Sequence, residues 1–190
     1  MNFLAHLLLA PDTPAGLAGN LGGDFLSPHE LPTLAPEVQA GIRRHHEVDT
    51  FTDTHPDFRA SCARVPAPFA RYAGILVDVY YDHLLSLRWA AYASEPLDAF
   101  IARVERTLLE HAELAPVRLR EVLPYMVEQG WLGSYADPEG LRSTLRRIGR
   151  RFRKPAPLDA AVDGLLAERE AYLADFECFF PQLLAAFPKA

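Results

Sequence analysis

The stretch PFARYAGILVDVYYDHLLSLRWAAY, residues 68–92, decides the fold class that the sequence predicts. Its apolar residues surround almost the whole circumference of a helix, which is typical of a central helix buried on all sides. Within it, the segment LVDVYYDHLL nevertheless holds Asp78, Asp82 and His83. Burying a carboxylate without a partner is costly. We therefore expect a positive or hydrogen-bonding group beside the two aspartates.

The rest of the chain is also predicted to be helical. Runs of alternating β-branched residues and hairpin turns are nearly absent. Apolar residues instead recur at three- and four-residue spacing in segments bounded by proline or glycine. These segments are 36–50, 95–113, 116–130, 138–153 and 157–180. We predict an all-α protein in which residues 1–190 form one domain of about seven or eight helices.

Length and composition favour one globular domain that stays in the cytoplasm. The 190 residues are 49% hydrophobic, which is enough for a substantial core. The opening MNFLAHLLLAP is too short to span a bilayer, and no lysine or arginine precedes Arg43, so a secretory leader and a membrane partner are not expected. Cys62 and Cys178 lie far apart and form no metal-binding motif, which favours two reduced thiols.

Positive charge is concentrated in one segment of an acidic chain. The formal net charge of −6 argues against nucleic acid as the main partner. The segment RSTLRRIGRRFRK, residues 142–154, nevertheless contains 7 of the 19 basic residues and no acid. Two interpretations stay open: a docking surface for an anionic partner, or a solvated helix face paired with acids elsewhere in the fold.

Four pairs of polar residues show the spacing of one helical turn. Residues four apart share a helix face, so each pair can direct two polar groups at one point. Helical bundles build metal sites from such pairs on facing helices. Nitrogen and oxygen ligands without thiolate suit Mn²⁺, Mg²⁺, Fe or Zn²⁺. The pairs are Asn2 and His6, Asn20 and Asp24, His45 and Asp49, and Asp78 and Asp82.

Each of these groups also has a structural explanation. Asp24 could cap a helix after Gly22 and Gly23, and Asp53 could cap the turn before Pro56. His6 alone could be a hydrogen-bonded core histidine. Asp78 and Asp82 are the strongest candidates, because their helix is so apolar. Spacing alone predicts a metal-dependent hydrolase without indicating its substrate.

Seven segments together resemble the acyl carrier protein phosphodiesterase family in order and spacing. They are MNFLAHLLLA, GNLGGDF, GIRRHHEVDTFTDTHP, DVYYDHLLSLRW and, more weakly, LPYMVEQGWLGSY through RRIGRRFRKP to FECFFPQL. The resemblance implies an HD-domain-like helical fold with a divalent cation, most often Mn²⁺, although Mg²⁺ or Fe²⁺ would also fit. It further implies hydrolysis of the phosphodiester that joins 4′-phosphopantetheine to a serine of holo acyl carrier protein.

The resemblance also implies roles for individual residues. Asp24, His45, Asp78 and Asp82 are expected to hold one or two cations. His6, His83 and Asp49 are expected to be catalytic, with His6 or His83 protonating the leaving serine oxygen, and Asn20 is expected to bind substrate. Asp53 belongs to the same motifs. The chain departs from the family pattern at Leu8, where a second histidine is common, and at His46 and Glu47, which leaves the role of His46 open.

The resemblance also implies a function for the basic segment. Acyl carrier proteins are small and acidic, and complementary charge steers and orients encounters. Docking is therefore expected at Arg146, Arg147, Arg150, Arg151 and Arg153. Two other functions stay open. One is hydrolysis of nucleotides or other small phosphodiesters on the same scaffold, and the other is a non-catalytic adaptor that binds a carrier protein or another acidic partner.

Overall fold

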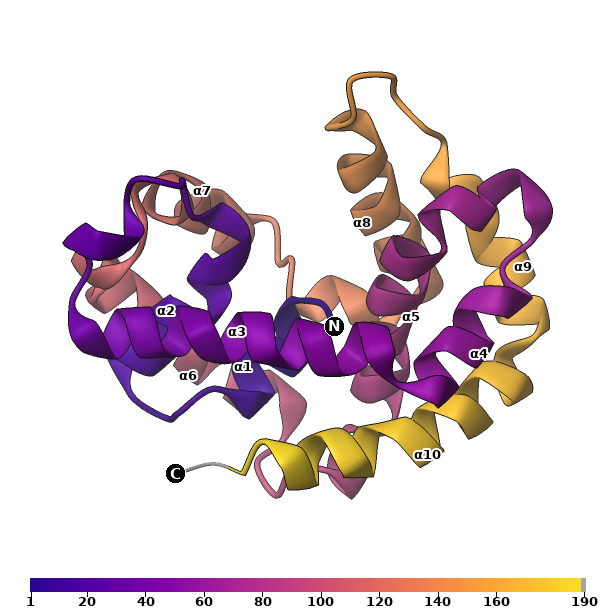
Figure 1. Cartoon of the computed structure of the whole chain (residues 1–190), viewed down its shortest axis with the longest axis horizontal. Helices are drawn as coiled ribbons and strands as arrows, with labels where there is room; N and C mark the ends of the chain where they lie inside the picture. Colours follow the sequence, from indigo (N-terminus) through magenta and orange to yellow (C-terminus); the bar gives the residue numbers. More distant parts are fainter. Residues whose placement is uncertain (189–190) are drawn as a thin grey trace.

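The computed structural model describes residues 1–188, which form ten α-helices, seven short 3₁₀ helices and no strand (Figure 1). The α-helices are α1 (Phe3–Leu9), α2 (Pro14–Gly22), α3 (Pro36–Thr54), α4 (Pro56–Arg64), α5 (Ala73–Leu87), α6 (Leu97–Glu110), α7 (Val117–Glu128), α8 (Pro138–Arg150), α9 (Val162–Ala167) and α10 (Arg169–Ala186). The 3₁₀ helices are η1 (Gly23–Phe25), η2 (Leu31–Thr33), η3 (Ala67–Tyr72), η4 (Trp89–Ala91), η5 (Ala112–Leu114), η6 (Gly133–Ala136) and η7 (Leu158–Ala161). The all-α prediction is confirmed.

The predicted number of helices was slightly too low, because α4 follows the predicted segment 36–50 as a separate helix and the predicted helix 157–180 is divided. Pro56 begins α4 directly after α3, and the residue before it, His55, is extended with φ −70° and ψ 134°. The predicted helix 157–180 is split into η7, α9 and α10, and the joint Glu168 has non-helical angles of φ −103° and ψ 23°. Within residues 1–188, no helix has the length and apolar composition needed to cross a bilayer.

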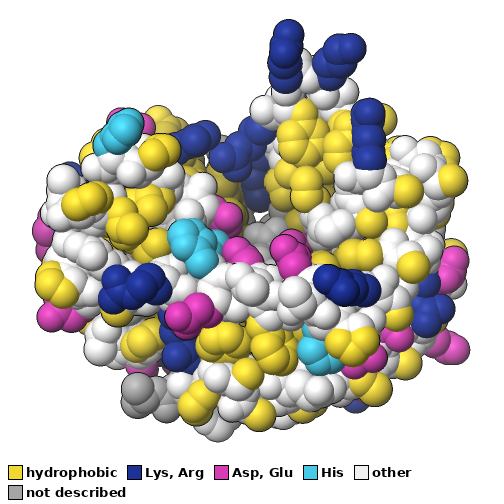
Figure 2. Space-filling view, in the orientation of Figure 1, with side chains coloured by type: hydrophobic (Ala, Val, Ile, Leu, Met, Phe, Trp, Pro, Cys, Tyr) yellow, Lys and Arg dark blue, Asp and Glu magenta, His cyan; other side chains and the backbone are white. Residues whose placement is uncertain are grey.

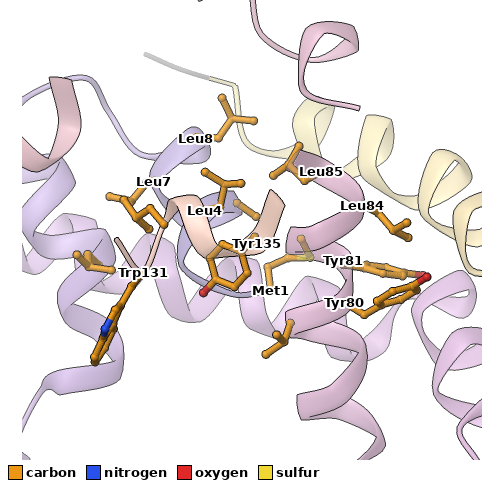
Figure 3. Close-up of a cluster of buried hydrophobic side chains, with 14 of the residues drawn as sticks. Met1, Leu4, Leu7, Leu8, Tyr80, Tyr81, Leu84, Leu85, Trp131 and Tyr135 are labelled. Carbon is orange, nitrogen blue, oxygen red and sulfur yellow. The ribbon is translucent and has the colours of Figure 1, made fainter. Parts of the chain in front are cut away.

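Helix α5 is the central element that its composition predicts. Tyr80, Tyr81 and Leu85 have no exposed surface. Figure 3 shows this side of the core, where the side chains of α5 lie beside Leu4 and Tyr135. Burial of so many large side chains is the main favourable term in folding, so α5 is a fixed frame against which the other helices are positioned.

Helices α2 and α3 approach each other closely because both carry a glycine at the crossing. A Cβ on Gly19 would lie 2.3 Å from the carbonyl oxygen of Val38, and a Cβ on Gly41 would lie 2.9 Å from the Cα of Gly19. No larger residue fits at either position. This contact sets α2 beside α3, and Asn20 of α2 and His45 of α3 both contact His6 of α1.

Candidate active site

Three of the predicted polar residues meet where α1 reaches α3. The Nε2 atom of His6 lies 3.0 Å from Oδ1 of Asp49, and the Nε2 atom of His45 lies 3.1 Å from Oδ2 of the same carboxylate. The two imidazole rings are stacked with their centroids 3.9 Å apart. One ligand atom from each of the three residues lies within 4.8 Å of the others. We call these residues the His–Asp cluster.

The motif GNLGGDF supplies the surroundings of the His–Asp cluster. Asp24 places its Oδ1 atom 3.6 Å from Nε2 of His45, and Oδ1 of Asn20 lies 3.2 Å from Nδ1 of His6. Gly23 makes room for the His45 ring, because a Cβ at this position would lie 2.3 Å from Cδ2 of the imidazole. The structure therefore places Asp24 and Asn20 beside the two histidines of the cluster.

The two histidines differ in electrostatic environment. Burial lowers the pKa of His6 to about 4, so its ring is neutral near neutral pH. Burial would lower the pKa of His45 too, but hydrogen bonds to Asp24 and Asp49 reverse the shift and raise it to about 9. Burial would raise the pKa of Asp49, yet the two histidines hold it well below its usual range. The carboxylates of Asp24 and Asp49 therefore favour the protonated, positively charged form of His45.

The chemistry of the cluster fits a divalent cation. His6 faces oxygens with both ring nitrogens: Asn20 Oδ1 at Nδ1, and the carbonyl oxygen of Met1 and Asp49 Oδ1 at Nε2, each 3.0 Å away. A neutral imidazole has only one N–H group. A cation at Nε2 would remove this conflict, because Nδ1–H would then donate to Asn20. One ligand atom from each of His6, His45 and Asp49 lies within 4.8 Å of the others, so the three residues are close enough to hold one ion.

Asp82 and Asp78 contact the N-terminal segment instead of the histidines. Asp82 has no exposed surface, and its two oxygens accept hydrogen bonds from the backbone N–H groups of Leu4 and Ala5, at 2.7 and 3.2 Å. The carboxylate therefore caps the start of α1. Asp78 Oδ1 lies 3.0 Å from the α-amino nitrogen of Met1. The partners of the aspartates in LVDVYYDHLL are thus an amino group and a helix N-terminus.

Their environments shift the pKa values of these groups. Burial raises the pKa of Asp82 to about 7, although the two N–H donors oppose the shift. Burial likewise raises the pKa of Asp78. Burial would lower the pKa of the Met1 amino group, but Asp78 and Asp49 raise it to about 10. Asp78 therefore joins the His–Asp cluster through an amino group that lies 3.0 Å from Asp78 and 3.5 Å from Asp49.

The remaining predicted residues on α5 and α3 lie apart from the cluster. The Nδ1 atom of His83 lies 2.7 Å from the carbonyl oxygen of Tyr135, and the buried ring stacks on Tyr80. The structure therefore does not bring His83 to the histidines of the cluster. His46 is exposed and only its ring edge approaches His45, which places His45 as the inward-facing histidine of the pair.

A cleft of about 320 Å³ opens beside the His–Asp cluster. Its acidic lining comes from Asp24, Asp49, Asp53 and Asp78, and Figure 2 shows acidic side chains in the hollow of the molecule with basic side chains along its rim. The other lining residues are Met1, Asn2, Phe3, Ile75, Val79, Ile148 and Arg151. Sequence analysis missed the apolar part of this lining. A signal was present, because Ile75 and Val79 are spaced by four residues around Asp78.

The first half of the basic segment is engaged within the fold. Arg142 forms an ion pair with Asp163, and Arg146 donates from Nε to Asp159 at 2.9 Å. The guanidinium of Arg147 lies 3.7 Å from the ring centroid of Trp131. These contacts hold α8 against η7, α9 and the loop before η6. The interpretation that the segment pairs with acids elsewhere in the fold is therefore confirmed for Arg142 and Arg146.

The second half of the segment is exposed at the end of α8 and in the loop that follows. Its residues make no ion pair within residues 1–188, and we call them the basic tip: Arg150, Arg151, Arg153 and Lys154. In Figure 2, lysine and arginine side chains gather where α8 projects beyond the rest of the molecule. Arg151 also lines the cleft. The basic tip therefore presents unpaired positive charge next to the acidic hollow.

Comparison with known proteins supports the resemblance seen in the sequence. The family described as acyl carrier protein phosphodiesterase matches residues 1–183. The chain belongs to this family. A protein of that name from Photorhabdus laumondii is 34% identical over 183 residues, which cover 96% of this chain and 90% of that protein.

Two further relatives bear the same name. The protein from Yersinia enterocolitica is 32% identical over 186 residues, or 97% of this chain and 96% of the relative. The protein from Pectobacterium atrosepticum is 32% identical over 183 residues, or 96% of this chain and 93% of the relative. No solved structure matches the chain. The HD-domain-like arrangement therefore stays a prediction.

Proposed function

We propose that this protein hydrolyses the phosphodiester that links 4′-phosphopantetheine to a serine of holo acyl carrier protein, releasing the apo carrier and free 4′-phosphopantetheine. The names of its relatives support the substrate class. The observation that carries the proposal is the His–Asp cluster beside a cleft that Arg151 also lines. Nitrogen and oxygen ligands can hold a cation that promotes phosphodiester hydrolysis. The guanidinium of the unpaired Arg151 can bind the phosphate.

His6, His45 and Asp49 are the proposed ligands of a divalent cation, most simply Mn²⁺, with Asp24 beside them. Such a cation supplies positive charge for a phosphoryl oxygen and acidifies water near neutral pH. Asn20 orients His6 by accepting from Nδ1, and Gly23 fixes the plane of the His45 ring. His6 and Asp49 take the places of Asp78 and Asp82 in the expected set, because Asp82 uses both oxygens to cap α1 and Asp78 contacts the amino group of Met1.

The chain also offers donors for the phosphate. Oδ1 of Asn2 accepts hydrogen bonds from the backbone N–H of Phe3 at 2.8 Å and from the hydroxyl of Tyr135 at 3.1 Å. These contacts fix the orientation of the amide, so its NH₂ group stays available to a ligand in the cleft that Asn2 lines. Arg151 adds a guanidinium, which matches phosphoryl oxygens bidentately.

The basic tip is the proposed docking surface for the acidic carrier protein. We expect the double variant Arg150→Glu, Arg153→Glu to raise KM for holo acyl carrier protein roughly tenfold or more at low salt, because reversed charge repels an acidic partner. The matched control is Arg146→Glu, which reverses charge on the same helix at a residue already paired with Asp159. Kinetics at low and high salt measure the effect. An equal rise of KM in the control, or none in the double variant, would contradict docking at the tip.

The deciding experiment is incubation of the purified protein with holo acyl carrier protein and Mn²⁺, followed by intact-mass analysis. We expect the carrier to lose the mass of its prosthetic group and chelator to stop the loss. Metal content is measured on the same sample, because a non-catalytic adaptor would not need a divalent ion. Turnover of small phosphodiesters with an unchanged carrier protein would support the nucleotide-type function instead.

A further inference from the structure

The cleft beside the His–Asp cluster is lined by residues of opposite chemistry. Asp24, Asp49 and Asp78 contribute carboxylates. Ile75 and Val79 of α5 and Ile148 of α8 contribute apolar side chains, which we call the isoleucine wall. Because Ile75, Asp78 and Val79 lie on the same helix, a ligand whose phosphate lies near Asp78 has its next atoms close to the isoleucine wall.

Aromatic contacts between the start of α5 and the end of α8 hold the isoleucine wall in place. Tyr72, which precedes α5, stacks on Phe152, which follows α8, with ring centroids 5.4 Å apart and planes 8° from parallel. Arg71 lies 4.5 Å from the ring centroid of Tyr72. These contacts join the start of α5 to the end of α8, so the spacing between Ile75 and Ile148 is fixed by packing.

We propose that the isoleucine wall binds the pantetheine arm of the substrate and makes the enzyme selective for phosphopantetheinyl diesters. This inference rests on the proposed function. In 4′-phosphopantetheine, the carbon that bears two methyl groups is separated from the phosphate oxygen by one CH₂ group. A phosphate near Asp78 therefore places this branched, apolar carbon within reach of the wall, where burial of both surfaces is favourable.

The same geometry disfavours other phosphodiesters. In a nucleotide diester, the atoms next to the phosphate belong to a sugar that carries hydroxyl or ether oxygens. Ile75, Val79 and Ile148 offer no hydrogen-bonding side-chain atoms for these groups, so their desolvation would be uncompensated. A volume of about 320 Å³ lies at the small end of the range for ligand sites, roughly 300–1,000 Å³. The wall thus suits the first part of the arm.

The test compares substrates with and without the arm. Ile148→Ala is assayed on holo acyl carrier protein and on methyl p-nitrophenyl phosphate, a diester that lacks pantetheine. We expect kcat/KM to fall roughly tenfold for the first substrate, because about three apolar carbons lose contact, and to stay nearly unchanged for the second. The matched control is Leu109→Ala, which removes an exposed apolar side chain from α6 outside the cleft.

Two further measurements separate this inference from the proposed function. Ile75→Ala repeats the comparison in case Ile148→Ala folds poorly. Calorimetric titration with 4′-phosphopantetheine should show a Kd about tenfold weaker in both variants than in the wild-type protein. Failure of the wild-type protein to cleave holo carrier protein would overturn the proposed function alone if 4′-phosphopantetheine still binds through the wall. Equal losses on both substrates, or binding that the variants leave unchanged, would overturn the isoleucine wall as a pantetheine site.

Discussion

Helices α3 and α5 each present an acidic residue one turn from another polar residue, but the two pairs contact different parts of the molecule. His45 and Asp49 on α3 turn toward His6 and form a cluster at the edge of a cleft. Asp78 and Asp82 on α5 turn toward the start of α1, where one contacts the amino group of Met1 and the other caps the helix.

The difference follows from what lies opposite each pair. Helix α3 faces the imidazole of His6 and the carboxylate of Asp24. Its pair, His45 and Asp49, therefore lies among groups that compete for protons. Helix α5 faces backbone N–H groups and an amino group, so its pair is neutralised by donors of the chain itself. We therefore assign chemistry to the α3 pair and positioning of α1 to Asp82. The following variants are designed to break that division.

The largest effect is expected at the carboxylate shared by both histidines. Asp49→Asn should lower kcat/KM by at least 10²–10³-fold, roughly, because both histidines lose the carboxylate that orients them and the proposed cation loses a ligand. Its helical circular dichroism should stay unchanged. The matched control is His46→Ala, which alters the exposed histidine next to His45 and should leave activity nearly intact. Full activity of Asp49→Asn would refute the assignment.

A smaller loss is expected from a glycine pair. Gly23→Ala should lower kcat/KM roughly 10- to 100-fold, because its Cβ would displace the ring of His45. Gly74→Ala on α5 is the control, since nothing lies within 4 Å of its added Cβ. It should keep full activity and gain about 0.5–1 kcal/mol of stability from higher helix propensity. Equal activity of the two variants would show that the ring position at His45 does not matter.

The sequence predicted the environment of α5 better than the direction of its polar side chains. The apolar circumference of residues 73–87 follows from the composition of that segment alone, and the structure confirms it. Four-residue spacing shows only that Asp78 and Asp82 share a face of the helix. The partner of that face depends on α1. The two N–H groups that bond to Asp82 belong to residues 78 and 77 positions earlier in the sequence. Local periodicity holds no information about such a partner.

The basic segment shows the same limit. Its charge density was evident in the sequence, but the division between Arg146 and Arg150 depends on Asp159, which η7 returns to the side of α8. The isoleucine wall was missed for a similar reason, because Ile148 lines the cleft only after α8 has packed on α5. The four-residue spacing of Ile75 and Val79 shows a shared face of α5 but holds no information about the contribution of Ile148 from α8.

On stability, the order of the two helices should reverse. Asp82→Ala should lower the free energy of unfolding by about 3 kcal/mol, because two buried N–H groups lose a charged acceptor. Asp78→Ala should cost about 1 kcal/mol or less, since its side chain is 28% exposed and the Met1 amino group keeps Asp49 as a neighbour. Urea denaturation of metal-free protein measures both. A larger loss for Asp78→Ala would show that the amino group, and not the cap, holds α1 in place.

The last effect is the pH dependence that Asp82 confers. Burial raises the pKa of Asp82 from 3.8 to about 7, so the folded state binds this proton more tightly than the unfolded state. The contribution to stability is therefore complete below about pH 4 and declines as the pH rises toward 7, with a slope of about 1 kcal/mol per pH unit. Asp82→Asn removes the titrating group and should remove the slope.

Comparing the two proteins isolates this term. Asp24 and Asp49, whose pKa values are lowered, make stability increase with pH in the acid range, but they are present in both proteins and cancel in the difference. We expect the stability of the wild-type protein relative to Asp82→Asn to fall between pH 4.5 and 7 in chelator. A relative stability that rises over the same range would mean that the N–H groups of Leu4 and Ala5 outweigh burial. Asp82 would then be a fully ionised cap, which would make the donors of α1 strong enough to hold a carboxylate with no cation beside it.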